Sequence, residues 1–113
     1  MQREVRKYLF DVQEAIELLQ SFMTGKDFSS YAGDMLLRAA VERELMIIGE
    51  ATVQLARLDQ SIAEEIRDFR RIISFRNRLV HLYDNLDVEI VWDVLIKDLP
   101  HLQQDINRLL KSD

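Results

Sequence analysis

The sequence contains no cysteine, only three glycines and one proline, and no apolar run close to the roughly 18 residues of a membrane-spanning helix. The absence of cysteine excludes disulfides, thiolate zinc sites and cysteine nucleophiles. The scarcity of glycine and proline argues against a β-sandwich or barrel, which needs a turn about every 8–12 residues. The N-terminus also lacks the apolar segment of a signal peptide, so we expect a cytoplasmic protein.

What is present is typical of one helical domain. The chain has 113 residues, of which 48% are hydrophobic and 31% charged, and we expect a single domain over residues 1–113. Leucine, isoleucine, glutamate, glutamine and arginine are abundant, and this composition favours helices. The net charge of −5 argues against a protein whose whole surface binds nucleic acid.

Apolar residues recur at intervals of three and four, which is the spacing of one face of an α-helix. The first such stripe covers 5–23 and is followed by Gly25, where the residue after a helix C-cap belongs. A central stretch over 33–58 carries two apolar stripes, so we expect this helix to be buried on two sides. Gly49 lies in its middle and predicts the close approach of another backbone.

Short polar side chains predict where the following helices begin. Ser29 or Ser30 is the candidate cap of the central helix. Ser61 with Glu64 has the S-x-x-E form of a capping box. Helical spacing then continues over 62–80, as a short helix and a longer one.

The last helix is predicted to begin after Asp87 and to extend over 88–109. Pro100 removes one backbone hydrogen bond, so we expect it to kink this helix rather than end it. Helices joined by short loops pack as antiparallel neighbours. The predicted fold class is therefore all-α, an up-down bundle of four to five helices, and we expect so short a chain to complete its core as a homodimer.

One window, residues 67–78, departs from the acidic average. It holds five arginines against one aspartate, a charge of +4, which leaves −9 for the rest of a chain whose total is −5. A cationic patch on an acidic body can hold a polyanion in one place, which makes Arg70, Arg71 and Arg78 candidate RNA-binding residues. The alternative is a solvated, salt-bridged helix face, and charge alone leaves both interpretations open.

The window leads directly into residues that suit metal-free RNA cleavage. Arg76 and His81 lie about 140° apart on a helix and meet only if it ends near His81. An imidazole can transfer the protons of the reaction, and a guanidinium can stabilise the charged phosphorane. Asn77 shares a face with His81 and could fix its tautomer, and Tyr83 could stack on a base or bind a phosphate. Because one histidine cannot easily be both acid and base, a symmetric dimer with two copies of His81 in one cleft would help.

The remaining polar residues suggest no second chemistry. His81 and His101 are twenty positions apart among scattered carboxylates, which is not a metal-ligand spacing, and no cofactor-binding motif is present. We therefore expect neither a metal nor a cofactor. His101, which has no cationic neighbours in the sequence, is expected to be structural, and a structural role is also the alternative for His81.

These residues resemble a known family. The pattern Arg76-x-x-x-x-His81-x-Tyr83, within Arg-Asn-Arg-Leu-Val-His, resembles the signature of HEPN domains, specifically of the HepT toxin branch. The stretch 41–51 (VERELMIIGEA) is similar to the second helix of that branch. Val91-Trp92 followed by Asp98-Leu99-Pro100 is similar to its last helix. The resemblance covers nearly the whole chain.

The resemblance implies a homodimeric, HEPN-like ribonuclease that acts without metal, with Arg76 and His81 as its RNA-cleaving residues. It also implies the toxin of a type VII-like toxin–antitoxin pair. The partner would be an MntA-type nucleotidyltransferase that transfers AMP from ATP onto Tyr83, since added negative charge and bulk at a cationic cleft weaken RNA binding. The alternatives are a non-catalytic dimeric module that binds nucleotide or RNA, or serves only as a nucleotidyltransferase substrate, and a plain helical adapter.

Overall fold

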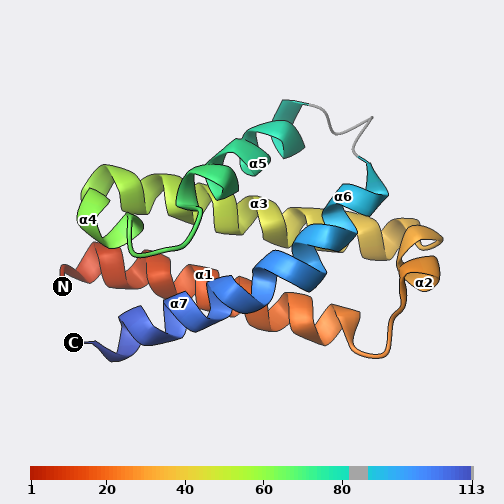
Figure 1. Ribbon diagram of the computed structural model, residues 1–113, viewed down its shortest axis with the longest axis horizontal. Helices are drawn as coiled ribbons and strands as arrows, with labels where there is room; N and C mark the ends of the chain where they lie inside the picture. Colours follow the sequence, from red (N-terminus) through yellow and green to blue (C-terminus); the bar gives the residue numbers. More distant parts are fainter. Residues whose placement is uncertain (82–86, 113) are drawn as a thin grey trace.

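The computed structural model describes residues 1–81 and 87–112, and every regular element in these ranges is a helix. Four long rods form the bundle, and two short helices join them (Figure 1). The elements are α1 (Arg3–Met23), α2 (Phe28–Ala32), α3 (Met35–Leu58), α4 (Gln60–Ala63), α5 (Phe69–His81), and a last rod made of α6 (Val88–Asp93), the π-helical η1 (Val94–Asp98) and α7 (Leu99–Lys111). The predicted all-α bundle is confirmed. None of the helices described is long and apolar enough to cross a membrane.

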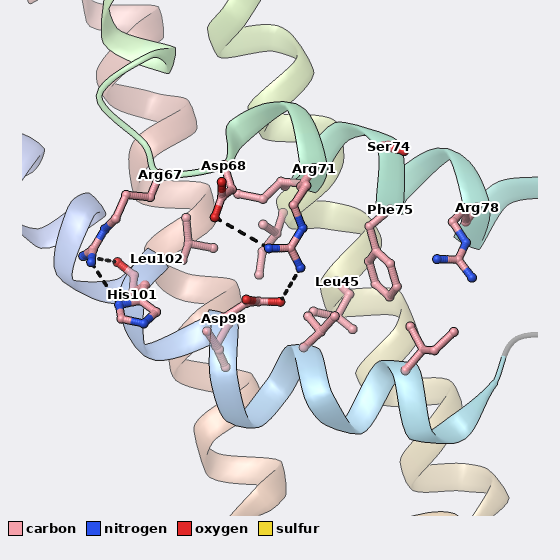
Figure 2. A pocket seen from close by; sticks show the side chains of 15 residues that line it. Leu45, Arg67, Asp68, Arg71, Ser74, Phe75, Arg78, Asp98, His101 and Leu102 are labelled. Atoms are coloured by element: carbon pink, nitrogen blue, oxygen red, sulfur yellow. Dashed lines mark hydrogen bonds and ion pairs between the residues drawn. The ribbon is translucent and has the colours of Figure 1, made fainter.

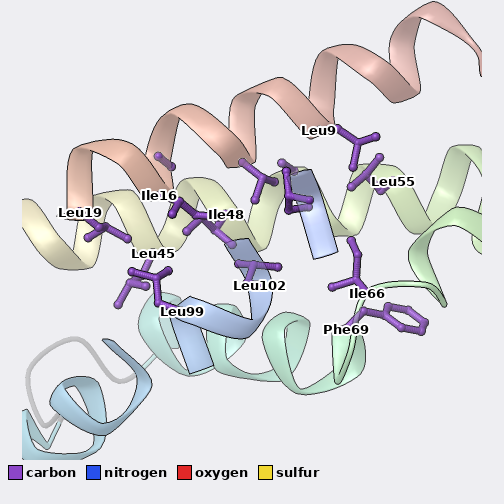
Figure 3. Packing of buried hydrophobic residues seen from close by; sticks show 14 of the residues in the cluster. Leu9, Ile16, Leu19, Leu45, Ile48, Leu55, Ile66, Phe69, Leu99 and Leu102 are labelled. Atoms are coloured by element: carbon purple, nitrogen blue, oxygen red, sulfur yellow. The ribbon is translucent and has the colours of Figure 1, made fainter. Parts of the chain in front are cut away.

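Helix α3 is the centre of the bundle, because it packs against α1 on one side and α5 on another, while α7 lies along α1 (Figure 1). The apolar stripe of α1 is buried from Val5 to Leu19, and the main stripe of α3 from Val41 to Leu55. Figure 3 shows these side chains meeting Leu99 and Leu102 of α7. The second stripe of α3 is buried only in part: Ala51 is buried, Ala40 and Ile47 are half-buried, and Leu36 is 81% exposed. The two-sided burial predicted for this helix is therefore confirmed only toward its C-terminal half.

Aspartates, rather than the predicted serines, cap α2 and α3. The Asp27 carboxylate accepts the backbone N–H of Ser30 at 2.8 Å, and the Ser30 hydroxyl accepts the N–H of Asp27 at 3.0 Å. Ser29 and Ser30 therefore lie inside the short helix α2, and Asp34 caps the central helix. The serine caps were wrong because a charged carboxylate at the next available position interacts more strongly with the positive end of the helix.

The same correction applies to α4. Asp59 caps this helix by accepting the N–H of Ile62 at 3.3 Å. The Ser61 hydroxyl donates to the Asp59 carboxylate at 2.6 Å, so Ser61 supports the cap instead of forming a capping box with Glu64. The division of the 62–80 stretch into a short and a longer helix is as predicted.

The last rod begins at its predicted cap, because the Asp87 carboxylate accepts the N–H of Glu89 at 2.8 Å. The rod continues past Pro100 to Lys111, as predicted. The irregularity around the proline takes the form of the π-helical segment η1, in which the N–H of Leu99 bonds to the carbonyl of Val94. Pro100 then lies in the first turn of α7, where a missing N–H costs little.

Candidate active site

Helix α5 carries the candidate residues Arg76, Asn77, Arg78 and His81, and His81 is the last residue of this helix that the structure describes. Arg76 and His81 were predicted to act on one ligand only if the helix ends near His81, and the residues after His81 that decide this lie outside the described residues. His81 is exposed. Tyr83, the residue expected to receive AMP, lies outside the described residues.

Arg76 lies where α5 crosses α3 at closest approach. A Cβ atom built on Gly49 of α3 would lie 2.2 Å from the Cβ of Arg76 and 2.6 Å from its Cγ, so no larger residue fits there. The close approach predicted at Gly49 is confirmed. The glycine allows the stem of Arg76 to lie directly against the backbone of α3.

The guanidinium of Arg76 is held by two polar neighbours. Its Nε donates to Oε1 of Glu50 at 2.7 Å, and its Nη2 donates to the same carboxylate oxygen. Its Nη1 donates to Oδ1 of Asn77 at 2.8 Å. Arginine has five N–H donors, so these three bonds fix the plane of the group and leave one N–H on each Nη. The side chain is 27% exposed and that of Glu50 46%, so a ligand can reach them.

Sequence reasoning missed Glu50 and gave Asn77 a different task. Asn77 was expected to fix the tautomer of His81, but its amide oxygen accepts from Arg76. Glu50 directly follows the glycine that α5 contacts, and that position next to Gly49 is the signal by which it could have been found. Glu50 and Asn77 together orient the candidate catalytic guanidinium.

Three other arginines of the cationic window are paired with acids. Arg70 lies 3.5 Å from the Glu64 carboxylate and over the ring of its neighbour Phe69. Arg71 lies 3.2 Å from Asp98 and 3.6 Å from Asp68. These three pairs are exposed, and such pairs contribute little to stability.

Arg67 is bound most extensively. Asp105, which is 1% exposed, accepts the Arg67 backbone N–H at 2.9 Å, the Arg67 side chain at 3.1–3.2 Å and Arg108 at 3.0 Å. Burial acts to raise the pKa of Asp105, but the hydrogen bonds from Arg67 and Arg108 outweigh it and hold that pKa below its usual value. This cluster ties the start of α5 to α7.

His101 belongs to the Arg67 cluster. Its Nδ1 lies 3.0 Å from Nη1 of Arg67, so the fold supplies the cationic neighbour that the sequence lacked. A guanidinium only donates hydrogen bonds, and Nδ1 therefore acts as the acceptor. This position is consistent with the structural role expected for His101. Arg78 is the one arginine of the window for which the described part of the chain offers no hydrogen-bond or ion-pair partner.

Across residues 1–81 and 87–112, no three histidine, aspartate or glutamate side chains form a group that could hold a metal ion. What the site does present is an oriented guanidinium with free donors and an exposed imidazole on the same helix. A guanidinium fits the oxygens of a phosphate, and an imidazole can transfer a proton near neutral pH. The arrangement can therefore bind a phosphodiester and exchange protons with it.

Comparisons with known proteins point in the same direction. The family described as "Ribonuclease HepT-like" matches residues 12–109. The protein named "Probable ribonuclease HepT" in Thermococcus cleftensis is 33% identical over 111 residues, covering 98% of this chain and all of the relative. A relative in Caldanaerobacter subterraneus is 27% identical over 108 residues and one in Methanocaldococcus jannaschii 26% over 106; their names contain the word RNase. The alignment with the Caldanaerobacter relative covers 96% of this chain and 96% of the relative. The alignment with the Methanocaldococcus relative covers 92% of this chain and 94% of the relative. No solved structure gives a significant match.

Proposed function

Because this chain belongs to the HepT-like ribonuclease family, we propose that it cleaves RNA without a metal at the Arg76–His81 end of α5, and that it is the toxin of a cytoplasmic toxin–antitoxin pair. One observation carries the proposal: Glu50 and Asn77 hold the guanidinium of Arg76 in one orientation and leave an N–H on each Nη free. A guanidinium fixed in this way can stabilise phosphorane charge without first losing its side-chain freedom.

The reaction follows from these groups. His81 accepts the proton of the ribose 2′-hydroxyl, and the 2′-oxygen attacks the adjacent phosphorus. Arg76 donates to the non-bridging oxygens as the phosphorane forms. The bond to the 5′-oxygen breaks, and that oxygen takes a proton from a second imidazole, so the products are a 2′,3′-cyclic phosphate and a 5′-hydroxyl. A homodimer with both copies of His81 in one cleft supplies the second imidazole.

Modification of Tyr83 controls this activity in the proposed system. An MntA-type nucleotidyltransferase joins the tyrosine oxygen to the α-phosphorus of ATP, and pyrophosphate leaves. Each AMP adds about one negative charge and an adenosine beside the cationic site. Repulsion of the RNA backbone affects every RNA sequence, which suits an off-switch.

RNA cleavage in EDTA by the purified wild type and by His81→Ala tests the nuclease. We expect cyclic phosphate ends from the wild type and a loss of about 10²–10⁴-fold in rate for the variant, the usual size of a proton-transfer contribution. Arg57→Gln removes an exposed charge from the far end of α3 and should cleave normally. Full activity in His81→Ala would refute the proposal.

Intact mass after co-expression with the nucleotidyltransferase tests the switch. The wild type should gain mass in steps of one AMP residue and lose its ribonuclease activity, whereas Tyr83→Phe should gain none and stay active. An equal mass gain in Tyr83→Phe would place the modification elsewhere and contradict this part of the proposal.

A non-catalytic RNA- or nucleotide-binding module is the second candidate. The observation in its favour is that Arg78 is exposed and has no partner among the residues described, so its guanidinium can bind a phosphate whether or not cleavage follows. It predicts RNA binding without cleavage by the wild-type dimer, an outcome that the EDTA assay separates from the first candidate.

A further inference from the structure

A groove runs beside the candidate active site, on another side of α5. It encloses a cavity of about 390 Å³ between α5 and the last rod, with Leu45 and Ile48 of α3 as its floor. Figure 2 shows this space with Arg71, Phe75 and Arg78 pointing from α5 toward the last rod. We call it the α5 groove. Its volume is that of a site for a small organic group.

The groove leads to the candidate catalytic histidine. Arg71, Phe75 and Arg78 follow one another on α5 at spacings of four and three, and His81 comes three positions later. These spacings form one stripe on a helix, about 15 Å long at 1.5 Å per residue. A single strand of RNA lying along this stripe of side chains would pass from the groove directly to His81.

The charges along the groove are uneven. At the end away from His81, Arg71 is compensated by Asp68 and by Asp98, the latter reached across the groove at 3.2 Å. The middle is apolar, because half-buried Phe75 lines it together with Ile90 and Val94 of the last rod. At the end near His81, Arg78 is exposed and has no partner among the residues described. The groove therefore combines an apolar slot with an uncompensated cation.

We propose that the α5 groove holds one unpaired nucleotide of the RNA substrate, with its base against Phe75 and its phosphate at Arg78. The proposal rests on the ribonuclease function proposed above, and it makes single-stranded RNA the substrate class. A nucleotide is an apolar, planar base joined to an anion, which matches the apolar slot and the free guanidinium. Only an unpaired base can offer its face to an aromatic ring, because a paired base is stacked between its neighbours.

Binding of an uncleavable RNA tests this site. The probe is a single-stranded oligonucleotide of about ten nucleotides, 2′-O-methylated throughout so that its 2′-oxygens cannot attack. Phe75→Leu keeps the apolar volume but removes the aromatic face, and it should weaken binding about tenfold. Arg78→Gln should weaken binding and reduce the slope of log affinity against log salt by about 0.7, the loss of one phosphate contact. Phe75→Leu should leave that slope unchanged, and Arg57→Gln serves as the charge control.

A second variant blocks the groove without changing charge. Val94→Phe places a larger ring on the facing wall, and it should weaken binding of the single strand while thermal unfolding shows a folded protein. The same oligonucleotide as a duplex should bind the wild type at least tenfold more weakly.

Several outcomes would overturn the proposal. The first is an RNA affinity of Phe75→Leu equal to that of the wild type, and the second is an equal affinity of the wild type for duplex and single strand. The third is a change of Phe75→Leu from dimer to monomer in sedimentation with unchanged RNA affinity, which would assign the groove to a second copy of the chain. Phe75-dependent binding by a wild type that does not cleave RNA would refute the nuclease and keep the groove. RNA cleavage by the wild type, together with RNA binding that neither Phe75→Leu nor Val94→Phe weakens, would refute the groove and keep the nuclease.

Discussion

Arg67 and Arg76 come from the same cationic window, yet they are bound in different ways. The acid that binds Arg67 is Asp105, which is 1% exposed, and further bonds come from the His101 carbonyl and Gln104. The acid that binds Arg76 is Glu50, which is 46% exposed, and among the residues described the guanidinium has one further bond, to Asn77 on the same helix. One guanidinium ties α5 to α7, and the other is oriented at an open surface.

The comparison shows that the number of arginines does not separate structural from functional ones. The burial of the acidic partner separates them. A buried carboxylate stays ionised only while its cation remains bound, whereas an exposed carboxylate leaves some N–H donors of its arginine free for a ligand. Substitutions around Arg67 should therefore change mainly stability, and substitutions around Arg76 mainly cleavage.

Among the residues that surround the two arginines, the largest effect is expected at Gly49. In Gly49→Ala the new Cβ overlaps the Cβ and Cγ of Arg76, so α5 must move away from α3. A displacement of about 1 Å at a reacting group can cost about 100-fold in rate, and we expect a loss of that size in RNA cleavage. Single-turnover cleavage, measured where the variant is folded, checks it.

Gly25→Ala is the control for Gly49→Ala. Gly25 has a φ of +73° but no atom within 4 Å of a new Cβ, so its substitution strains a turn without moving the site. It should lower the free energy of unfolding by about 1 kcal/mol and leave cleavage unchanged. Equal cleavage by the two alanine variants would show that the contact between Gly49 and Arg76 does not position the guanidinium.

Asp105→Asn should affect stability rather than chemistry. It removes the buried charge that Arg67 and Arg108 bind, and should lower the free energy of unfolding by about 2 kcal/mol at neutral pH. Because the pKa of Asp105 is lowered in the folded protein, its stabilising effect is full above the unfolded value of about 4 and is lost as pH falls through the folded value. Urea unfolding from about pH 7 to about pH 3 should show the difference from wild type shrink below about pH 4.

If the stability difference between Asp105→Asn and the wild type stays constant over that pH range, ionised Asp105 does not stabilise the fold. Cleavage per folded molecule should remain within a few-fold of wild type, since Asp105 contacts none of the candidate catalytic residues. A large loss of cleavage would show that the residues around Arg67 also position the candidate catalytic residues, contrary to the difference drawn above between Arg67 and Arg76.

The smallest effect is expected for Glu50→Gln. The amide still accepts a hydrogen bond but no longer attracts the guanidinium, so we expect kcat to fall about tenfold with little change in KM, as for a lost orientation. Stability should change by less than about 1 kcal/mol because the pair is partly exposed. The matched control is Glu64→Gln, which weakens the exposed pair with Arg70. Equal kcat in the two variants would contradict a positioning role for Glu50.

Much of the fold could be predicted because apolar spacing is a local property. The stripes over 5–23 and 88–109 and the centre of 33–58 are buried as expected. Helix starts were less predictable, since Asp27, Asp34 and Asp59 compete with nearby serines for the same role. The π-helical segment before Pro100 depends on how a whole turn absorbs one missing bond, which spacing does not reveal.

The site was predictable only in part. Arg76, Asn77 and His81 could be proposed from the sequence because they are neighbours on one helix. Glu50 and Asp105 lie 26 and 38 positions from the arginines they bind, so their roles depend on how helices pack. The net charge of the 67–78 window could therefore be obtained from the sequence, but which acid binds each arginine could not.

The most direct test compares Arg67→Gln and Arg76→Gln in one experiment, measuring both the free energy of unfolding and single-turnover RNA cleavage. Arg76→Gln should cleave at least about 100-fold more slowly with a stability change below about 1 kcal/mol. Arg67→Gln should lose about 3 kcal/mol of stability, because buried Asp105 then keeps Arg108 as its one cationic partner among the residues described, and the variant should still cleave when folded. Wild-type cleavage by Arg76→Gln would contradict the account.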